Sequence, residues 1–317
     1  MSDNDPIRLF TGSRSSRLAG AIAANLGVEI GSSETRRFSD GNLFVKVQEN
    51  VRGHDIYLVH ATVFPSNDNF MELLFWIDAF KRASARSVTV ILPYFSYGKG
   101  DKKDEPRVSI RARVCADTIE VAGADRVVSV DLHSPQIQGF FRIPVDNLYA
   151  LGVLSDRIRA EGKDDLVVVS PDAGFARDAR RYAKTLGASI AIADKERKDH
   201  EGLAEVWDVI GDVEGKDAVI VDDFTISGGT LVSCANELIG MGARSVFAAV
   251  THGVFTEGSM KRIDQSPLEK VIITDSVENQ PVSFSPKVEV VSVAPLLAEA
   301  IERIHTRQSI SVMFSGS

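Results

Sequence analysis

The chain has 317 residues, of which 44% are hydrophobic and 25% are charged, and its formal net charge is −8. This length is enough for about two domains, and this composition is typical of a globular protein with a buried core. The acidic balance argues against nucleic acid as a partner, no apolar run is long enough for a membrane span, and the polar N-terminus does not resemble a secretory signal.

Strand-like apolar runs alternate with helical patterns along the chain. In chain order the sequence predicts a helix at 16–26, a strand at 56–59, a helix at 69–85, a strand at 88–92, a helix at 111–122, strands at 127–130 and 166–169, a helix at 174–186, strands at 190–192 and 218–221, a helix at 231–241, strands at 247–250, 271–274 and 288–291, and a helix at 293–304. Such alternation predicts an α/β fold of mainly parallel sheets flanked by helices.

The two halves of the chain echo each other. Ala-Arg-Ser-Val occurs at 85–88 and at 243–246, and HDIYLVHATVFPS from His54 parallels KDAVIVDDFTISGG from Lys216. Two echoes at nearly equal offsets indicate duplication of one α/β unit. We therefore expect domains at 1–148 and 149–317, with the tail 307–317 as a candidate for packing back on the first domain.

Two isolated cysteines, Cys115 and Cys234, allow neither a CxxC pair nor a disulfide framework. Such cysteine usage is typical of the reducing cytoplasm, which is the expected location. We interpret each as a small core residue, with a reactive thiol as the alternative.

The stretch Val219–Thr230, VIVDDFTISGGT, contains the most informative pattern. A buried parallel strand is predicted to end at Asp222 and Asp223, at the sheet edge where open α/β folds bind ligands. The hydroxyls and glycines that follow can surround a phosphate at the start of the next helix. A phosphate seat beside two carboxylates, which can bind sugar hydroxyls or Mg²⁺, predicts a sugar phosphate ligand. The alternative is an ordinary strand–turn–helix junction.

Two other strands end in residues suited to metal or ligand binding. His133 follows the strand at 127–130, and Asp172 follows the strand at 166–169. We predict a metal or ligand role for both because they occupy the same kind of sheet edge. The alternatives are a structural histidine and a carboxylate that caps the following helix.

Two charged segments are candidates for phosphate contacts. Lys195 and Arg197 lie in the charge run 194–200, which we interpret as a loop able to close over a transferring phosphoryl group. The segment 97–103, YGKGDKK, could follow nucleotide phosphates or form a mobile turn. Neither a Walker A motif nor a full GxGxxG is present.

These motifs together resemble ribose-phosphate pyrophosphokinases, also called phosphoribosyl pyrophosphate synthetases. The resemblance rests on RFSDGN (37–42), ENVRG (49–53), MELLFWIDAFKRASA (71–85), GADRV (123–127), DLHSPQIQGFFRIPVDNLYA (131–150), SPDAG (170–174), DKERK (194–198), VDDFTISGGT (221–230) and VTHGVF (250–255). It implies two duplicated domains of the type I phosphoribosyltransferase-like fold. It also implies transfer of the diphosphoryl group of Mg-ATP to the anomeric hydroxyl of ribose 5-phosphate, giving phosphoribosyl pyrophosphate and AMP for nucleotide biosynthesis.

The resemblance assigns roles to particular residues. It implies that His133 and Asp172 bind Mg²⁺ and that Lys195 and Arg197 are catalytic. The implied substrate-binding residues are Asp222, Asp223, Thr225, Ser227, Gly228, Gly229 and Thr230. The implied contacts to ATP are Phe38, Asp40, Asn42, Lys99 and Asp101. The ATP site of this family lies between subunits of a homo-oligomer built from dimers, often a hexamer.

The chain departs from the family pattern at several positions. Lys99-Gly100 stands where Arg-Gln is common, Asn42 where Glu is common and Phe175 where a second glycine is usual. Ile226 replaces a polar residue of the phosphate loop, and Ser227 replaces Thr. A lysine cannot stack on adenine as an arginine plane can. The changes at 99, 100 and 226 predict weak activation by phosphate, weak inhibition by ADP and a broader range of donors, as in the phosphate-independent branch.

Three other functions are open at this point. A phosphoribosyltransferase would use the same acidic pair and glycine loop, although the full-length match argues against it. The others are a non-catalytic regulatory homologue and a pyrophosphokinase with a different sugar phosphate.

Overall fold

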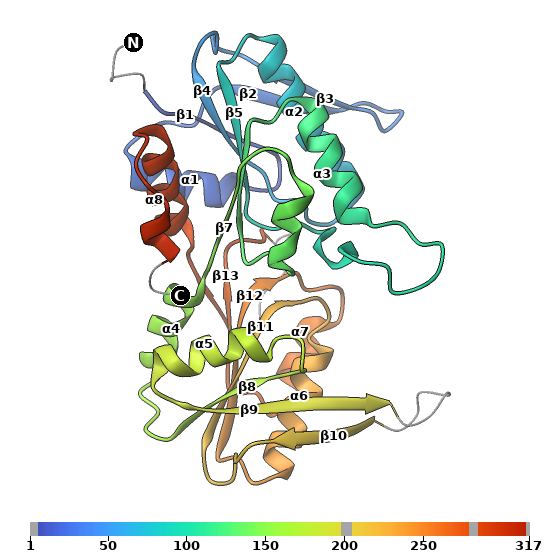
Figure 1. The fold of residues 1–317 in the computed structure, drawn as a ribbon, viewed down its shortest axis with the longest axis vertical. Helices are drawn as coiled ribbons and strands as arrows, with labels where there is room; N and C mark the ends of the chain where they lie inside the picture. Colours follow the sequence, from blue (N-terminus) through green and yellow to red (C-terminus); the bar gives the residue numbers. More distant parts are fainter. Residues whose placement is uncertain (1–5, 198–204, 279–284, 315–317) are drawn as a thin grey trace. The chain divides into compact units, whose positions relative to one another are not determined.

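The computed structural model describes residues 6–197, 205–278 and 285–314 (Figure 1). The chain forms two compact units. The first contains the chain up to Tyr149 together with Asp275–Glu278 and the segment that begins at Ser292. The second runs from Ala150 to Thr274 and ends with strand β14 (Val288–Val291).

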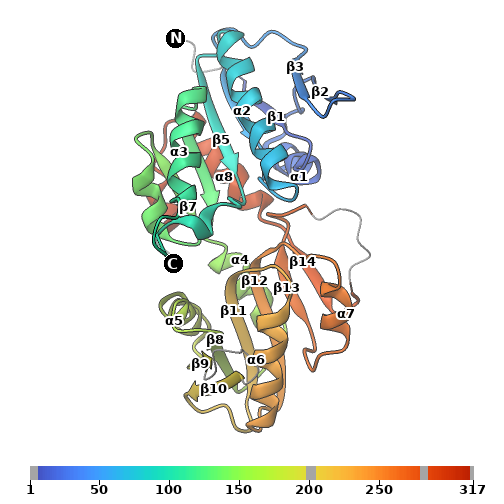
Figure 2. The ribbon, with the colours of Figure 1, turned by 90° about the vertical axis from the view of Figure 1, so that its right-hand side faces the viewer.

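The first unit is built on a five-stranded parallel sheet (Figures 1 and 2). Its strands, in spatial order, are β1 (Arg8–Thr11), β4 (Asp55–Val59), β5 (Ser87–Leu92), β6 (Arg126–Val130) and β7 (Val145–Leu148). Its helices are α1 (Ser16–Leu26), α2 (Ser66–Arg82), α3 (Arg111–Ala122) and α8 (Ala294–His305), with 3₁₀ turns η1 (Gly98–Gly100), η2 (Pro135–Phe140) and η3 (Ser311–Phe314). An antiparallel hairpin, β2 (Ser33–Arg37) and β3 (Leu43–Val47), stands apart from the sheet.

The core of this unit explains why the strands read as continuous apolar runs. Ile56–Val59 are all buried, as expected for a parallel sheet covered on both faces. Helix α2 contributes Leu73, Trp76 and Phe80 to the core. Helix α8 packs beside α1, so the end of the chain joins the unit that the beginning forms (Figure 1).

The second unit contains a seven-stranded sheet in the order β10, β9, β8, β11, β12, β13, β14. The strands are β8 (Leu166–Ser170), β9 (Ser189–Arg197), β10 (Glu205–Ile210), β11 (Asp217–Thr225), β12 (Ser245–Gly253), β13 (Val271–Thr274) and β14. All pairs are parallel except β9 with β10. The helices are α4 (Leu151–Arg159), α5 (Ala176–Leu186), α6 (Gly229–Gly240) and α7 (Ser259–Asp264).

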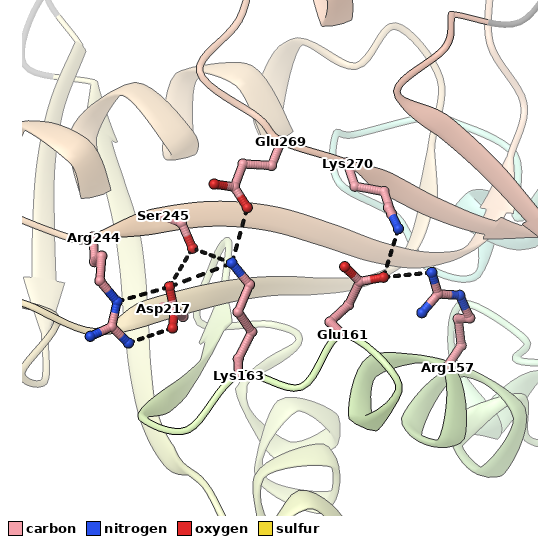
Figure 3. A network of polar contacts seen from close by, with 8 residues as sticks. All are labelled: Arg157, Glu161, Lys163, Asp217, Arg244, Ser245, Glu269 and Lys270. Carbon is pink, nitrogen blue, oxygen red and sulfur yellow. Dashed lines mark hydrogen bonds and ion pairs between the residues drawn. The ribbon is translucent and has the colours of Figure 1, made fainter.

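The sequence echo has a structural cause. Asp217, the first residue of β11, accepts hydrogen bonds from Arg244 and Ser245 at the start of the neighbouring strand β12 (Figure 3). The first unit repeats these contacts with Asp55, Arg86 and Ser87 at the starts of β4 and β5. The Arg-Ser of each echo therefore fixes the register of two neighbouring parallel strands, which supports duplication of one unit.

Every predicted strand and helix is present in the structure, with ends shifted by up to three residues for the helices. Cys115 and Cys234 are both buried, as predicted. Within the described ranges, no helix is long and apolar enough to cross a membrane. The elements that the sequence reasoning missed are short or partly exposed: β1, β2, β3, β7, α4, β10 and α7.

Two local predictions were wrong. The charge run from Asp194 was expected to be a loop, but β9 continues to Arg197 because β10 pairs with it, with Lys195 opposite Trp207. The acidic pair was expected to follow its strand, but β11 runs on to Thr225 because β12 continues alongside it. Both strands are longer than their apolar cores.

Candidate functional site

Strand β11 carries the acidic pair into the middle of the second sheet. It lies between β8 and β12, and Asp223 is buried at its carboxyl end. Each carboxylate accepts a backbone hydrogen bond: Asp222 Oδ1 lies 2.9 Å from the N of Asp223, and Asp223 Oδ1 lies 2.9 Å from the N of Phe224. Carboxylate oxygens can also accept hydrogen bonds from sugar hydroxyls or bind a cation.

The loop after β11 folds tightly against the start of α6. Thr225 Oγ1 accepts a hydrogen bond from the N–H of Gly228 at 3.2 Å, and Ser227 Oγ accepts one from the N–H of Gly229 at 3.2 Å. Gly228 has a φ of 72°, which favours glycine at this position. Helix α6 begins at Gly229, two residues before its predicted start, so Thr230 lies in its first turn. The loop thus gathers hydroxyls and backbone N–H groups at a helix N-terminus, an arrangement suited to a phosphate.

Residues that follow β12 hold this loop in place by hydrogen bonds to its backbone carbonyls. The carbonyl of Ile226 accepts hydrogen bonds from the N–H of Thr256 at 2.9 Å and from Ser259 Oγ at 3.3 Å. The guanidinium of Arg262 donates to the carbonyl of Ser227. Sequence reasoning missed these residues. A signal for them was present, because β12 follows β11 after one helix, and consecutive parallel strands often pair with their carboxyl ends at one sheet edge.

The acidic pair is electrostatically unfavourable without a cation. Burial raises the pKa of Asp222 well above its ordinary value, and the charges of Asp223 and Asp172 raise it further. Asp172 thus lies close enough to affect the pair, although it comes from the end of β8. Its Oδ1 accepts a hydrogen bond from the N–H of Phe175 at 2.9 Å, just before α5 begins. This contact agrees with the alternative that Asp172 caps the following helix. It involves only Oδ1, so Oδ2 can bind another partner.

The predicted ATP contacts at 38–42 lie at the tip of the β2–β3 hairpin in the first unit. Asp40 accepts hydrogen bonds from the backbone N–H of Asn42 at 3.0 Å and from its side-chain amide at 2.8 Å. The backbone bond and then the amide bond lower the pKa of the Asp40 carboxyl. Phe38 is half exposed, and its ring lies 6.0 Å from that of Phe44. The tip is therefore a self-supported loop that presents an aromatic ring.

The turn that carries Lys99 lies beside His133. A Cβ placed on Gly98 would be 3.5 Å from the Cβ of His133, and both Lys99 and His133 are exposed. The hairpin and this turn are both attached to the first turn of α2, the hairpin by an ion pair between Arg37 and Asp68. The turn is attached by a hydrogen bond from Tyr97 to Asn67.

The first unit has no acidic pair at the position that the duplication assigns to it. There the end of β4 carries His60, which is buried, and its Nε2 lies 2.7 Å from the carbonyl oxygen of Asn69. A Cβ on Gly12 would fall 1.7 Å from His60 Nδ1, so the space beside the ring is closed.

The structure divides the predicted site residues between the two units. Those in the first unit are Phe38, Asp40, Asn42, Lys99, Asp101 and His133. Those in the second unit are Asp172, Asp222, Asp223, Thr225, Ser227, Gly228, Gly229 and Thr230. For Lys195 and Arg197 the structure describes the backbone, on β9, but not the side chains. No three His, Cys, Asp or Glu side chains gather as a metal site in the part of the chain that the structure describes.

Comparison with protein families gives two matches. Residues 7–123 match the model of the N-terminal domain of ribose phosphate pyrophosphokinase. Residues 204–315 match the phosphoribosyl synthetase-associated domain.

Individual relatives match along nearly their whole length. The ribose-phosphate pyrophosphokinase of Brucella melitensis is 45% identical over 310 residues, covering 97% of this chain and 100% of the relative. That of Maricaulis maris is 47% identical over 310 residues, with the same coverage. The crystal structure of phosphoribosylpyrophosphate synthetase from Mycobacterium smegmatis is 38% identical, covers 95% of this chain and 99% of that chain, and superposes with a TM-score of 0.90.

Proposed function

The chain belongs to the ribose-phosphate pyrophosphokinase family, and on that premise we propose that its second unit binds ribose 5-phosphate at the 222–230 loop while its first unit binds the nucleotide. It is a ribose-phosphate diphosphokinase, an enzyme that produces phosphoribosyl pyrophosphate. The observation that carries the proposal is the acidic pair on β11, directly before a hydroxyl-rich and glycine-rich loop at the start of α6.

The proposed reaction displaces AMP from ATP. The oxygen of the anomeric hydroxyl attacks the β-phosphorus, the bond from that phosphorus to the α,β-bridging oxygen breaks, and AMP leaves with the bridging oxygen. The hydroxyl proton is released to water. Asp222 and Asp223 hold the ribose hydroxyls, and the 225–230 loop holds the 5-phosphate, which together fix the position of the attacking anomeric oxygen.

The cation proposed for this site is Mg²⁺, which when bound offsets charge on the triphosphate. Asp172 fits a hard cation because it is an exposed carboxylate with one oxygen free of its contact to Phe175. The raised pKa of Asp222 supports this further, since a nearby cation would relieve the repulsion among the three carboxylates. The assignment of His133 to Mg²⁺ rests on the family resemblance alone, since a ring nitrogen suits magnesium less well than an oxygen does.

The remaining roles follow the family motif. Lys195 and Arg197 offset charge on the transferring group, from the end of β9. Phe38, Asp40 and Asn42 contact ATP from the hairpin tip, and Lys99 and Asp101 contact it from the neighbouring turn. The half-exposed ring of Phe38 supports an assembly in which the hairpin completes a site in another subunit of a homo-oligomer. Sedimentation of a monomer at assay concentrations would contradict that assembly.

We further propose that phosphate activates this enzyme only weakly, that ADP inhibits it weakly, and that it accepts donors other than ATP. Support comes from Lys99, Gly100 and Ile226, where the chain departs from the common pattern. Ile226 is 39% exposed on the phosphate loop, so an apolar side chain stands where a polar one is usual.

One assay tests activity and regulation together. Purified protein is incubated with Mg²⁺, ribose 5-phosphate and ATP or GTP, with and without inorganic phosphate, while AMP or GMP and phosphoribosyl pyrophosphate are measured. We expect equimolar products with either nucleotide and little dependence on phosphate. Steep phosphate dependence with strict use of ATP would refute the regulatory proposal, and absence of both products would refute the proposed substrates.

A further inference from the structure

Arg111, the first residue of α3, lies across the turn that carries Lys99. A Cβ placed on Gly100 would be 2.8 Å from the Cβ of Arg111 and 2.7 Å from its Nε. Separations below 3.0 Å are not found for real Cβ atoms, so the arginine occupies the volume that a side chain at position 100 would need. The absence of a side chain at Gly100 is therefore what allows Arg111 to contact the backbone of this turn.

The guanidinium of Arg111 is available for a ligand. The residue is exposed, and within the described part of the chain it makes neither an ion pair nor a side-chain hydrogen bond. Arg113, two residues later, differs because it pairs with Asp117 and donates to the carbonyl of Phe140. Arg111 also lies near Tyr97: burial raises the pKa of that phenol, and the charge of Arg111 opposes the rise.

Arg111 lies beside a turn that is already proposed to contact the donor nucleotide. Lys99 stands on the same turn, and His133 lies against Gly98 at its other end. Lysine offers a point charge to a nucleotide, whereas arginine offers a flat cation that stacks on a ring. A planar cation therefore lies beside this turn: the guanidinium of Arg111, which α3 places against Gly100.

We propose that the Arg111 guanidinium stacks on the base of the donor nucleotide and sets the affinity for that donor. This inference rests on the proposed binding of the nucleotide at the 97–101 turn. Every base has a π-face, so stacking contributes affinity without selecting one base. Arg111 therefore strengthens binding of ATP and GTP alike.

Kinetics of two substitutions test the proposal. Arg111→Ala should raise KM for ATP roughly tenfold, the effect of removing one stacking side chain, and should raise KM for GTP by a similar factor. Arg111→Lys keeps the charge but not the plane, so it should lose nearly as much. KM for ribose 5-phosphate, measured at saturating ATP, should stay within about twofold, because that substrate is assigned to the other unit.

A glycine substitution provides an independent test. The Cβ of Gly100→Ala would displace Arg111, so this variant should raise KM for ATP as Arg111→Ala does, and the double variant should be no worse than either. Gly20→Ala is the matched control, because a Cβ at Gly20 meets nothing within 4 Å. It should leave both KM values unchanged.

The outcomes separate this inference from the proposed function. An unchanged KM for ATP in Arg111→Ala, full activity of Arg111→Lys, or a loss confined to one nucleotide would overturn the stacking role while wild-type turnover still supported the function. No product from the wild-type enzyme would refute the function itself. Direct binding of ATP by calorimetry would then still measure whether Arg111 contacts the nucleotide, and equal affinities of wild type and Arg111→Ala would overturn the stacking role.

Discussion

The buried carboxylate of Asp217 should stabilise the second unit measurably, and Asp217→Asn should remove that stabilisation. Its side chain is only 7% exposed, and it accepts hydrogen bonds from Ser245 Oγ at 2.5 Å and Arg244 Nε at 3.2 Å, with Lys163 Nζ 3.7 Å away (Figure 3). The contact with Arg244 and then that with Ser245 outweigh burial and lower the pKa of Asp217 to about 2, from an ordinary 3.8.

The magnitude follows from this shift. A difference of about two pKa units corresponds to roughly 2–3 kcal/mol at neutral pH. Arg244 is half exposed, so solvent screening reduces the contribution to about 1–2 kcal/mol. Because the pKa is lowered by folding, the stabilisation is fully present above pH 4 and is lost as the pH falls through about 2.

Thermal unfolding measures the effect. At pH 7 we expect Asp217→Asn to lower the melting temperature of the second unit by about 2–8 °C, and this deficit should shrink below pH 4. Asp212→Asn is the control, because it removes a charge from the same unit at a side chain that is 73% exposed, and it should leave the transition unchanged. Equal melting of Asp217→Asn and wild type at pH 7, or a deficit that does not depend on pH, would refute this account of the contact.

Three further predictions concern the site. Lys195→Ala and Arg197→Ala should each lower kcat by roughly two powers of ten or more while sedimentation shows intact assembly; unchanged rates would remove both from the mechanism. Because burial raises the pKa of Asp222, its ionisation costs stability, so the wild-type protein without ligands should become less stable as the pH rises through that raised pKa. Asp222→Asn should melt higher than wild type at pH 8 without Mg²⁺ yet lose activity, and a lower melting temperature would contradict this. Arg262→Met should raise KM for ribose 5-phosphate several-fold without changing KM for ATP, because it frees the carbonyl of Ser227, and Arg262→Lys should restore part of the loss. Equal changes in both KM values would indicate general unfolding instead.

The candidate substrate-binding residues of the second unit could be grouped from the sequence because they are consecutive. The acidic pair, the hydroxyls and the glycines of 222–230 all belong to one strand–loop–helix junction, so local order fixes their proximity. The contacts of Thr256, Ser259 and Arg262 to that loop come from about thirty residues further along the chain. Their proximity depends on the pairing of β11 with β12.

At the charged residues 194–197, by contrast, the local sequence predicted the wrong structure. Charged residues of this kind usually form solvated loops, and the local sequence contains nothing that overrides this. The strand continues through these charged residues because β10, with Val206 and Trp207 in its sequence, pairs with β9 from Ile192 to Arg197. Strand length is set by the partner as much as by the residues of the strand itself.

By itself the sequence determined the α/β class, the duplication and the position of the acidic pair before its glycine-rich loop, because apolar periodicity and contiguous motifs are local properties. Only the tertiary structure decided three relations. Arg111 lies against Gly100, the charge of Asp172 affects the pKa of Asp222, and α8 packs beside α1. These pairs are separated by 11, 50 and more than 260 residues. They come together because parallel strands bring their ends to one edge of a sheet and helices bury their apolar faces against it. Local sequence patterns do not contain this geometry.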